Sequence, residues 1–158
     1  MTSAGTDQAT TPSPGRVTTP ARRLALIAAL LAGLLLTNLV IYAIGRALGG
    51  AFTYQQNGTA VLVEPVAVTF MSLAPLVFGL GLVAALSRKW PATIRVARIV
   101  APILAVATIA VMTVPAGFDT TSALSLAAMH LALIPASLLA LNALPRGPGR
   151  ATRPFPPQ

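Results

Sequence analysis

Four long apolar stretches occupy most of this chain and constrain its fold more than any other feature. They cover Leu24–Ile44, Val66–Leu86, Ile99–Val114 and Ala123–Leu144. Each is close to the roughly 20 residues that a helix needs to cross a bilayer. Lipid offers the backbone no hydrogen bonds, so only helices and closed barrels span it, and continuously apolar runs indicate helices. We therefore predict an all-α protein, a four-helix transmembrane bundle.

The apolar stretches also set the predicted domain organisation. One transmembrane domain covers residues 22–144, with helices at about 24–46, 65–87, 92–115 and 122–144. Residues 1–21 and 145–158 are rich in small residues and proline and poor in large apolar side chains. Such segments cannot bury enough surface to order themselves, so we predict two disordered tails.

The composition fits a membrane protein and excludes several function classes. Hydrophobic residues make up 55% of the chain and charged residues 9%, whereas a soluble domain carries about 25% charged residues. The net charge of +8 would suit a nucleic-acid-binding protein, but here the cations flank apolar helices. We therefore expect no nucleic-acid partner. The chain has no cysteine, which excludes thiolate metal sites and cysteine nucleophiles.

The cationic residues lie almost entirely on one side of the predicted spans. The ten on that side are Arg16, Arg22, Arg23, Arg88, Lys89, Arg95, Arg98, Arg146, Arg150 and Arg153. Positively charged loops stay in the cytoplasm, so we predict a multi-pass protein of the cell membrane with both termini cytoplasmic. We also expect the cations next to the spans to contact anionic lipid headgroups. These are Arg22, Arg23, Arg88, Lys89, Arg95 and Arg98.

Two connections are predicted on the opposite, outer side. Gly45–Pro65 is an outer loop with a turn signal at Asn57-Gly58, and Pro115–Thr121 is a short turn. Aromatic side chains near these connections are expected to form a belt at the outer membrane surface. They are Tyr42, Phe52, Tyr54 and Phe118.

One polar residue in each span suggests a polar layer in the outer half of the bundle. His130, the only histidine, lies about 12 Å from the outer end of its helix. Asn38, Ser72 and Thr108 lie at similar depths in the other three helices. Intramembrane ionisable residues often bind a ligand or carry protons. Alternatively, the layer is structural, with interhelical hydrogen bonds of about 0.6 kcal/mol each. Both interpretations stay open.

The acidic residues near the spans have two interpretations of the same kind. Glu64 and Asp119 each precede a predicted helix, where a carboxylate caps the helix and interacts favourably with its dipole. If the outer ends converge, both could instead form a charged mouth with Arg46, the one cation on that side. Known catalytic motifs are absent from the sequence, and a single histidine cannot supply both axial ligands of a haem. We therefore expect no metal and no cofactor.

Several of these features together resemble a known family. They are the arginine-flanked first helix with Asn38, the proline-containing second helix, the cationic loop with Trp90, and Met129-His130-Leu131 in the fourth helix. The chain is similar over about residues 22–144 to small actinobacterial four-helix membrane proteins that form a family of unknown function. The resemblance implies an integral membrane location and four helices, and it implies no activity, cofactor or catalytic residue.

Three functions are compatible with the sequence. We favour a non-enzymatic accessory or interaction subunit, whose partner is another membrane protein or a second copy of this chain. The first alternative is a small oligomeric transporter or channel with the polar layer around His130 and Asn38 along its path. The second is a membrane enzyme or haem carrier whose site is shared between subunits.

Overall fold

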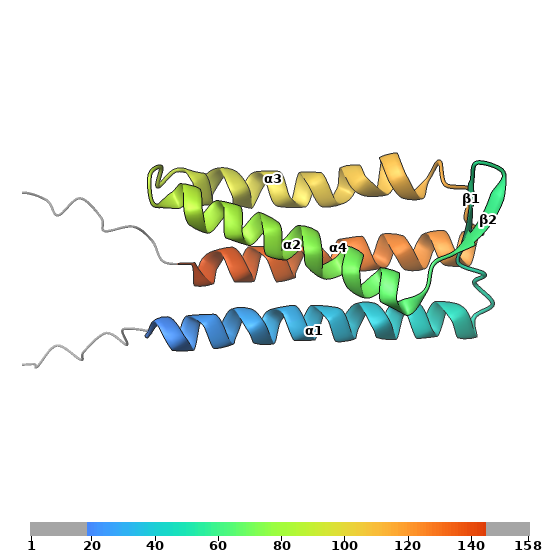
Figure 1. Ribbon diagram of the computed structural model, residues 1–158, viewed down its shortest axis with the longest axis horizontal. Helices are drawn as coiled ribbons and strands as arrows, with labels where there is room; N and C mark the ends of the chain where they lie inside the picture. The colour runs from blue at the N-terminus through green and yellow to red at the C-terminus, as the bar shows by residue number, and fades with distance from the viewer. Residues whose placement is uncertain (1–18, 145–158) are drawn as a thin grey trace, which may run out of the picture.

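The protein is an antiparallel bundle of four long helices with a small β-hairpin at one end (Figure 1). The computed structural model describes residues 19–144. The elements are α1 (Pro20–Ala47), β1 (Thr53–Gln56), β2 (Thr59–Leu62), α2 (Pro65–Ser87), α3 (Thr93–Thr108), the π-helical segment η1 (Ile109–Thr113) and α4 (Thr120–Ala143). The hairpin lies at what we call the hairpin end, and both ends of the described chain lie at the other (Figure 1).

All four helices are long and apolar enough to cross a membrane. The spans contain 28, 23, 21 and 24 residues, the third being α3 continued by η1. Few side chains along them are buried, and large apolar ones such as Phe70, Phe78 and Ile103 are exposed. In water such a surface would drive association, whereas in a bilayer it meets lipid. The prediction of an all-α, four-helix transmembrane protein is confirmed.

The helix bounds agree closely with those predicted, with two differences. α1 begins at Pro20 rather than near residue 24, because Thr19 caps it by accepting a hydrogen bond from the Arg22 amide at 3.4 Å. Proline suits the first helical turn, since its missing N–H has no partner there. At the third span, α3 passes into the π-helical η1, in which the Val114 amide donates to the Ile109 carbonyl oxygen at 3.1 Å. Most of the two predicted disordered tails lies outside the described residues.

The helices pack around α4, which contacts all three others, while α1 and α3 do not touch each other. Two buried apolar clusters lie along this arrangement. The inner cluster joins Leu80, Ile94, Ala140, Leu141 and Leu144. The outer cluster, nearer the hairpin, joins Tyr42, Phe52, Val68 and Met129. The core is thus built from residues of all four helices and of the loop after α1.

The loop between α1 and α2 contains a β-hairpin, whereas the sequence predicted only a turn there. β1 and β2 pair antiparallel, with Gln56 opposite Thr59 and Thr53 opposite Leu62. Asn57 and Gly58 form the two-residue turn with φ of 51° and 80°. Positive φ at both positions is the pattern of the tight hairpin turn that Asn-Gly favours. The turn signal was therefore recognised, and the four-residue strands around it were too short to be read from an alternating pattern.

Candidate functional site

Two of the four residues in the predicted polar layer meet each other. The Asn38 side-chain amide donates to the Ser72 hydroxyl at 2.8 Å, which links α1 to α2 in the bundle interior. Asn38 is 1% exposed and Ser72 is 6% exposed, and Asn38 Oδ1 has no hydrogen-bond partner in the structure. The pair is therefore a buried polar contact between helices, with one acceptor left unsatisfied.

The other two residues of the predicted layer bond within their own helices. The Thr108 hydroxyl donates to the Leu104 carbonyl oxygen at 2.7 Å. His130 Nδ1 lies 2.8 Å from the Leu126 carbonyl oxygen, and because that oxygen only accepts, Nδ1 carries the hydrogen. His130 is half-buried. The structure thus joins Asn38 to Ser72 and gives Thr108 and His130 partners along α3 and α4 instead.

Two of the three residues in the predicted charged mouth, Arg46 and Asp119, bind the backbone of one loop. Arg46 donates through Nη1 to the carbonyl oxygens of Gly50 and Ala51, at 3.2 and 2.8 Å. From the other side, Asp119 Oδ2 accepts from the Ala51 amide at 3.0 Å. Arg46 and Asp119 therefore both form hydrogen bonds to the short segment between α1 and β1. Glu64 is the N-cap residue of α2, but its side chain makes no capping bond.

Asp119 also caps α4, as one interpretation of the sequence proposed. Its Oδ1 accepts from the Ser122 amide at 3.0 Å, and its Oδ2 accepts from the Ser122 hydroxyl at 2.5 Å. The hydrogen bond from the Ser122 hydroxyl, together with those from the Ser122 and Ala51 amides, lowers the pKa of Asp119 from 3.8 to about 2. The carboxylate is thus charged at any physiological pH and holds the loop to the start of α4.

A buried contact behind Asp119 was missed by the sequence reading. Ser122 accepts a hydrogen bond from the Phe52 amide at 2.8 Å, and both residues are fully buried. Phe52 has a φ of 54°, a conformation rare for a bulky residue, and its ring packs on Tyr42 at a centroid distance of 4.6 Å. A Cβ on Gly45 would meet the Phe52 ring at 2.8 Å, so only glycine fits beneath it. We call Gly45, Phe52, Asp119 and Ser122 the loop latch.

The loop latch corrects the prediction of an outer aromatic belt. Tyr42 and Phe52 are buried, and the Tyr42 hydroxyl donates to the Val63 carbonyl oxygen at 2.9 Å. Tyr54 and Phe118 instead pack on each other, with ring centroids 5.7 Å apart. The aromatic residues near the hairpin end thus tie the loops together. The sequence signal for this was Gly50 before Phe52, where an added Cβ would meet the Phe52 ring at 2.9 Å.

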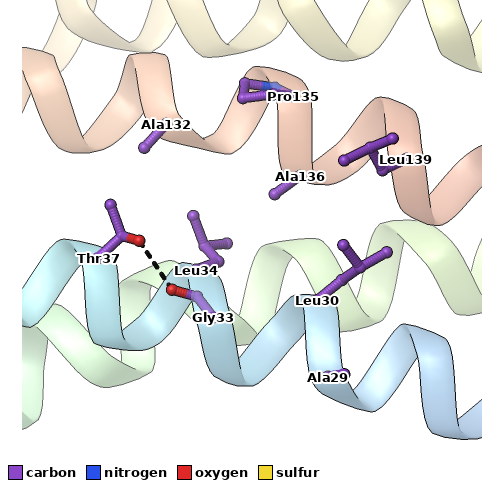
Figure 2. Close-up of a pocket in the computed structure, with 9 residues that line it drawn as sticks. All are labelled: Ala29, Leu30, Gly33, Leu34, Thr37, Ala132, Pro135, Ala136 and Leu139. Atoms are coloured by element: carbon purple, nitrogen blue, oxygen red, sulfur yellow. Dashed lines mark hydrogen bonds between the residues drawn. The ribbon is translucent and has the colours of Figure 1, made fainter.

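A groove runs between α1 and α4 on the surface of the bundle. Its cavity volume is about 340 Å³, and its lining combines small residues with two leucines of α1 and one of α4 (Figure 2). The lining residues are Ala29, Leu30, Gly33, Leu34, Thr37, Ala132, Pro135, Ala136 and Leu139. Figure 2 shows Leu30 and Leu34 pointing toward α4 and Ala132 and Ala136 pointing toward α1. Only the Thr37 hydroxyl adds polarity, and it donates to the Gly33 carbonyl oxygen at 2.8 Å.

The cations predicted to contact lipid gather at the end opposite the hairpin, which we call the cationic end. Of these six residues, four are exposed and two are half-buried. The exposed ones are Arg22, Arg88, Lys89 and Arg95, and the half-buried ones are Arg23 and Arg98. Glu64 and Asp119, the two acids of the described chain, both lie at the hairpin end. Within residues 19–144, no cluster of three His, Cys, Asp or Glu side chains could hold a metal ion.

Comparison with known proteins places the chain in a family without assigning an activity. No curated protein matches it, and no solved structure matches it either. Its sequence does match one family profile over residues 17–143, which covers all four helices and the hairpin. This chain, a protein with four candidate membrane spans, therefore belongs to the family of unknown function DUF6069.

Proposed function

We propose that this protein is a non-enzymatic accessory subunit of the cell membrane that docks a transmembrane helix of a partner protein in the groove between α1 and α4. In this proposal the cationic end faces the cytoplasm, as the distribution of charge predicts. The groove is the observation that carries the proposal, since it is an apolar hollow in the surface of the bundle.

The chemistry of the groove suits a helix. On α1, Ala29, Gly33 and Thr37 recur every fourth residue, and Ala132 and Ala136 do the same on α4. Small residues at this spacing let membrane helices approach closely and gain dispersion contacts. A Cβ added to Gly33 would meet no atom within 4 Å, so the α1 backbone is open to an approaching neighbour.

The concave shape favours a partner over a second copy of this chain. A symmetric dimer presents the same patch on both subunits. Two copies joined across this face would therefore bring one groove against another and leave the space between them unfilled. A single apolar helix is convex and fills the groove, and its apolar side chains match the alanine and leucine lining.

The test compares three forms of the full chain, purified from native membranes in a mild detergent and weighed by native mass spectrometry. Gly33→Leu fills the groove with a side chain. Gly81→Leu is the matched control, because Gly81 is also an exposed helical glycine with no atom within 4 Å of an added Cβ. We expect the wild type and Gly81→Leu to retain one membrane protein at fixed stoichiometry, and Gly33→Leu to lose it.

Three results would contradict the proposal. Equal retention by Gly33→Leu and the wild type would show that the groove is not the docking surface. A homodimer that Gly33→Leu dissociates would make a second copy the occupant. Movement of a solute across liposomes by the pure protein alone would contradict an accessory role and favour the transporter alternative.

A further inference from the structure

Arg98 is one of the two half-buried cations of the cationic end, and its Nε atom is shielded from solvent. It lies one helical turn after Ile94, on the same face of α3. Ile94 is buried in the inner cluster with Leu141 and Leu144 of the α4 end, and Ala97 packs against that cluster too. Arg98 is accordingly half-buried, whereas Arg95 on the neighbouring row is exposed.

The buried part of Arg98 is not satisfied by the protein. Its Nε atom is shielded from solvent and has no hydrogen-bond partner in the structure. A buried donor that belongs to a charged group is among the most unfavourable groups to leave unpaired. Within residues 19–144 no carboxylate is at hand, because Glu64 and Asp119 lie at the hairpin end. The donor therefore needs an acceptor that these residues do not provide.

The surroundings of Arg98 favour an anion at the first turn of α3. Helical side chains lean toward the helix N-terminus, which directs Arg98 toward the membrane surface at the cationic end. There the N-cap residue of α3, Ala92, offers no side-chain acceptor, and the first turn contains no acid. The helix dipole attracts negative charge at such an end. Arg95, three residues from Arg98, adds a second cation on the adjacent row.

We propose that Arg98 binds a phosphate group at the start of α3, and that this phosphate is carried by an anionic phospholipid headgroup. A guanidinium presents its donors in a planar fork that matches phosphate, and Nε is one arm of that fork. Arg98 lies five residues after the start of the span Thr93–Thr113, so its side chain reaches the level of lipid headgroups. The exposed apolar side chains of α3, such as Ile99 and Ile103, border the acyl chains of the same lipid.

The experiment measures lipid retention by the full-length protein in nanodiscs of phosphatidylcholine and phosphatidylglycerol. After release, native mass spectrometry gives the ratio of the two lipids that stay bound. Arg98→Gln should lower the preference for phosphatidylglycerol about tenfold or more, the loss expected for a charged hydrogen bond. Arg88→Gln, the control at an exposed cation, should lower it only about fivefold, the effect of one surface charge.

Further arms separate the outcomes. Arg98→Lys keeps the charge without the fork and should retain an intermediate preference, and its thermal unfolding reports whether the bundle is intact. Equal losses for Arg98→Gln and Arg88→Gln would overturn the proposal in favour of general surface attraction. Saturable binding of inorganic phosphate to the protein in neutral micelles, with no preference between the two lipids, would overturn the lipid as its source.

Discussion

The two ends of the bundle differ in how far their charged side chains have hydrogen-bond partners within the described residues. At the hairpin end, Arg46 and Asp119 both find partners in the loop at residues 50–51. At the cationic end, Arg98 keeps a shielded Nε atom that no residue of the described chain satisfies. Arg46 and Asp119 at the hairpin end are thus satisfied within the protein. The cationic end contains a donor that we propose is satisfied by a bound anion.

This difference suggests that one end of the protein stabilises the fold, while other surfaces bind partners. The loop latch fixes the connections between α1, β1 and α4, so it acts on the fold. The groove is an apolar hollow in the surface of the bundle. The cationic end has a shielded donor without a partner in the described residues, so we propose both places for binding. Changes at the hairpin end should therefore alter stability, and changes at the other sites should alter what the protein retains.

The largest loss of stability should come from Gly45→Ala, because Gly45 packs against the Phe52 ring in the loop latch. The new Cβ would overlap the Ser125 hydroxyl and meet the Phe52 ring at 2.8 Å. Overpacking of this kind typically destabilises by about 1–3 kcal/mol. Gly81→Ala is the control, because its Cβ enters open space. Denaturant unfolding in detergent measures both, and equal stabilities would show that the hairpin end is not a tightly packed unit.

A smaller effect is expected from the polar pair between the two clusters. Asn38→Ala and Ser72→Ala remove the two partners of a buried interhelical hydrogen bond. Such bonds in membrane proteins contribute about 0.6 kcal/mol on average. A double-mutant cycle on the free energy of unfolding should give a coupling near this value. A coupling of zero would mean that the bond is not formed in the bilayer. A coupling far above it would mean that Asn38 Oδ1 has found a further partner.

The smallest effect should be the pH dependence of the loop latch, because the Asp119 carboxylate is exposed to solvent. Hydrogen bonds from Ser122 and Ala51 lower the pKa of Asp119 from 3.8 to about 2. A carboxyl group with a lowered pKa stabilises the fold above its unfolded value and loses that stabilisation as the pH falls through the folded one. The unfolding midpoint should thus drop between pH 4 and pH 2. Asp119→Asn should flatten this part of the profile, and an unchanged profile would separate Asp119 from the latch.

The sequence predicted the architecture well because its signal is physical and local. The helix α2 was predicted at residues 65–87, and the structure has it at Pro65–Ser87. Apolar length fixes such spans, since the bilayer allows few alternatives. Capping by an acid before a helix was predicted for both Asp119 and Glu64, and the structure shows the capping bond at Asp119 but not at Glu64.

The contacts between distant residues could not be predicted in the same way. The Phe52 amide meets Ser122, which is 70 positions along the chain. Depth in the membrane placed Thr108 and His130 level with Asn38 and Ser72, but depth does not say which way a side chain faces. Both instead bond to carbonyls of their own helices. Rotation about a helix axis is set by packing between helices, and a single apolar sequence contains little information about it.

The orientation of the two ends can be measured directly, because the chain has no native cysteine. Gln56→Cys places a thiol on the hairpin and Ala92→Cys places one before α3, both at exposed positions. A maleimide that cannot cross membranes should label Gln56→Cys in intact cells, and Ala92→Cys only after the cells are permeabilised. The reverse pattern would put the hairpin end inside and the cationic end outside. It would contradict the account of a self-contained outer end and a cytoplasmic end that meets anionic lipid.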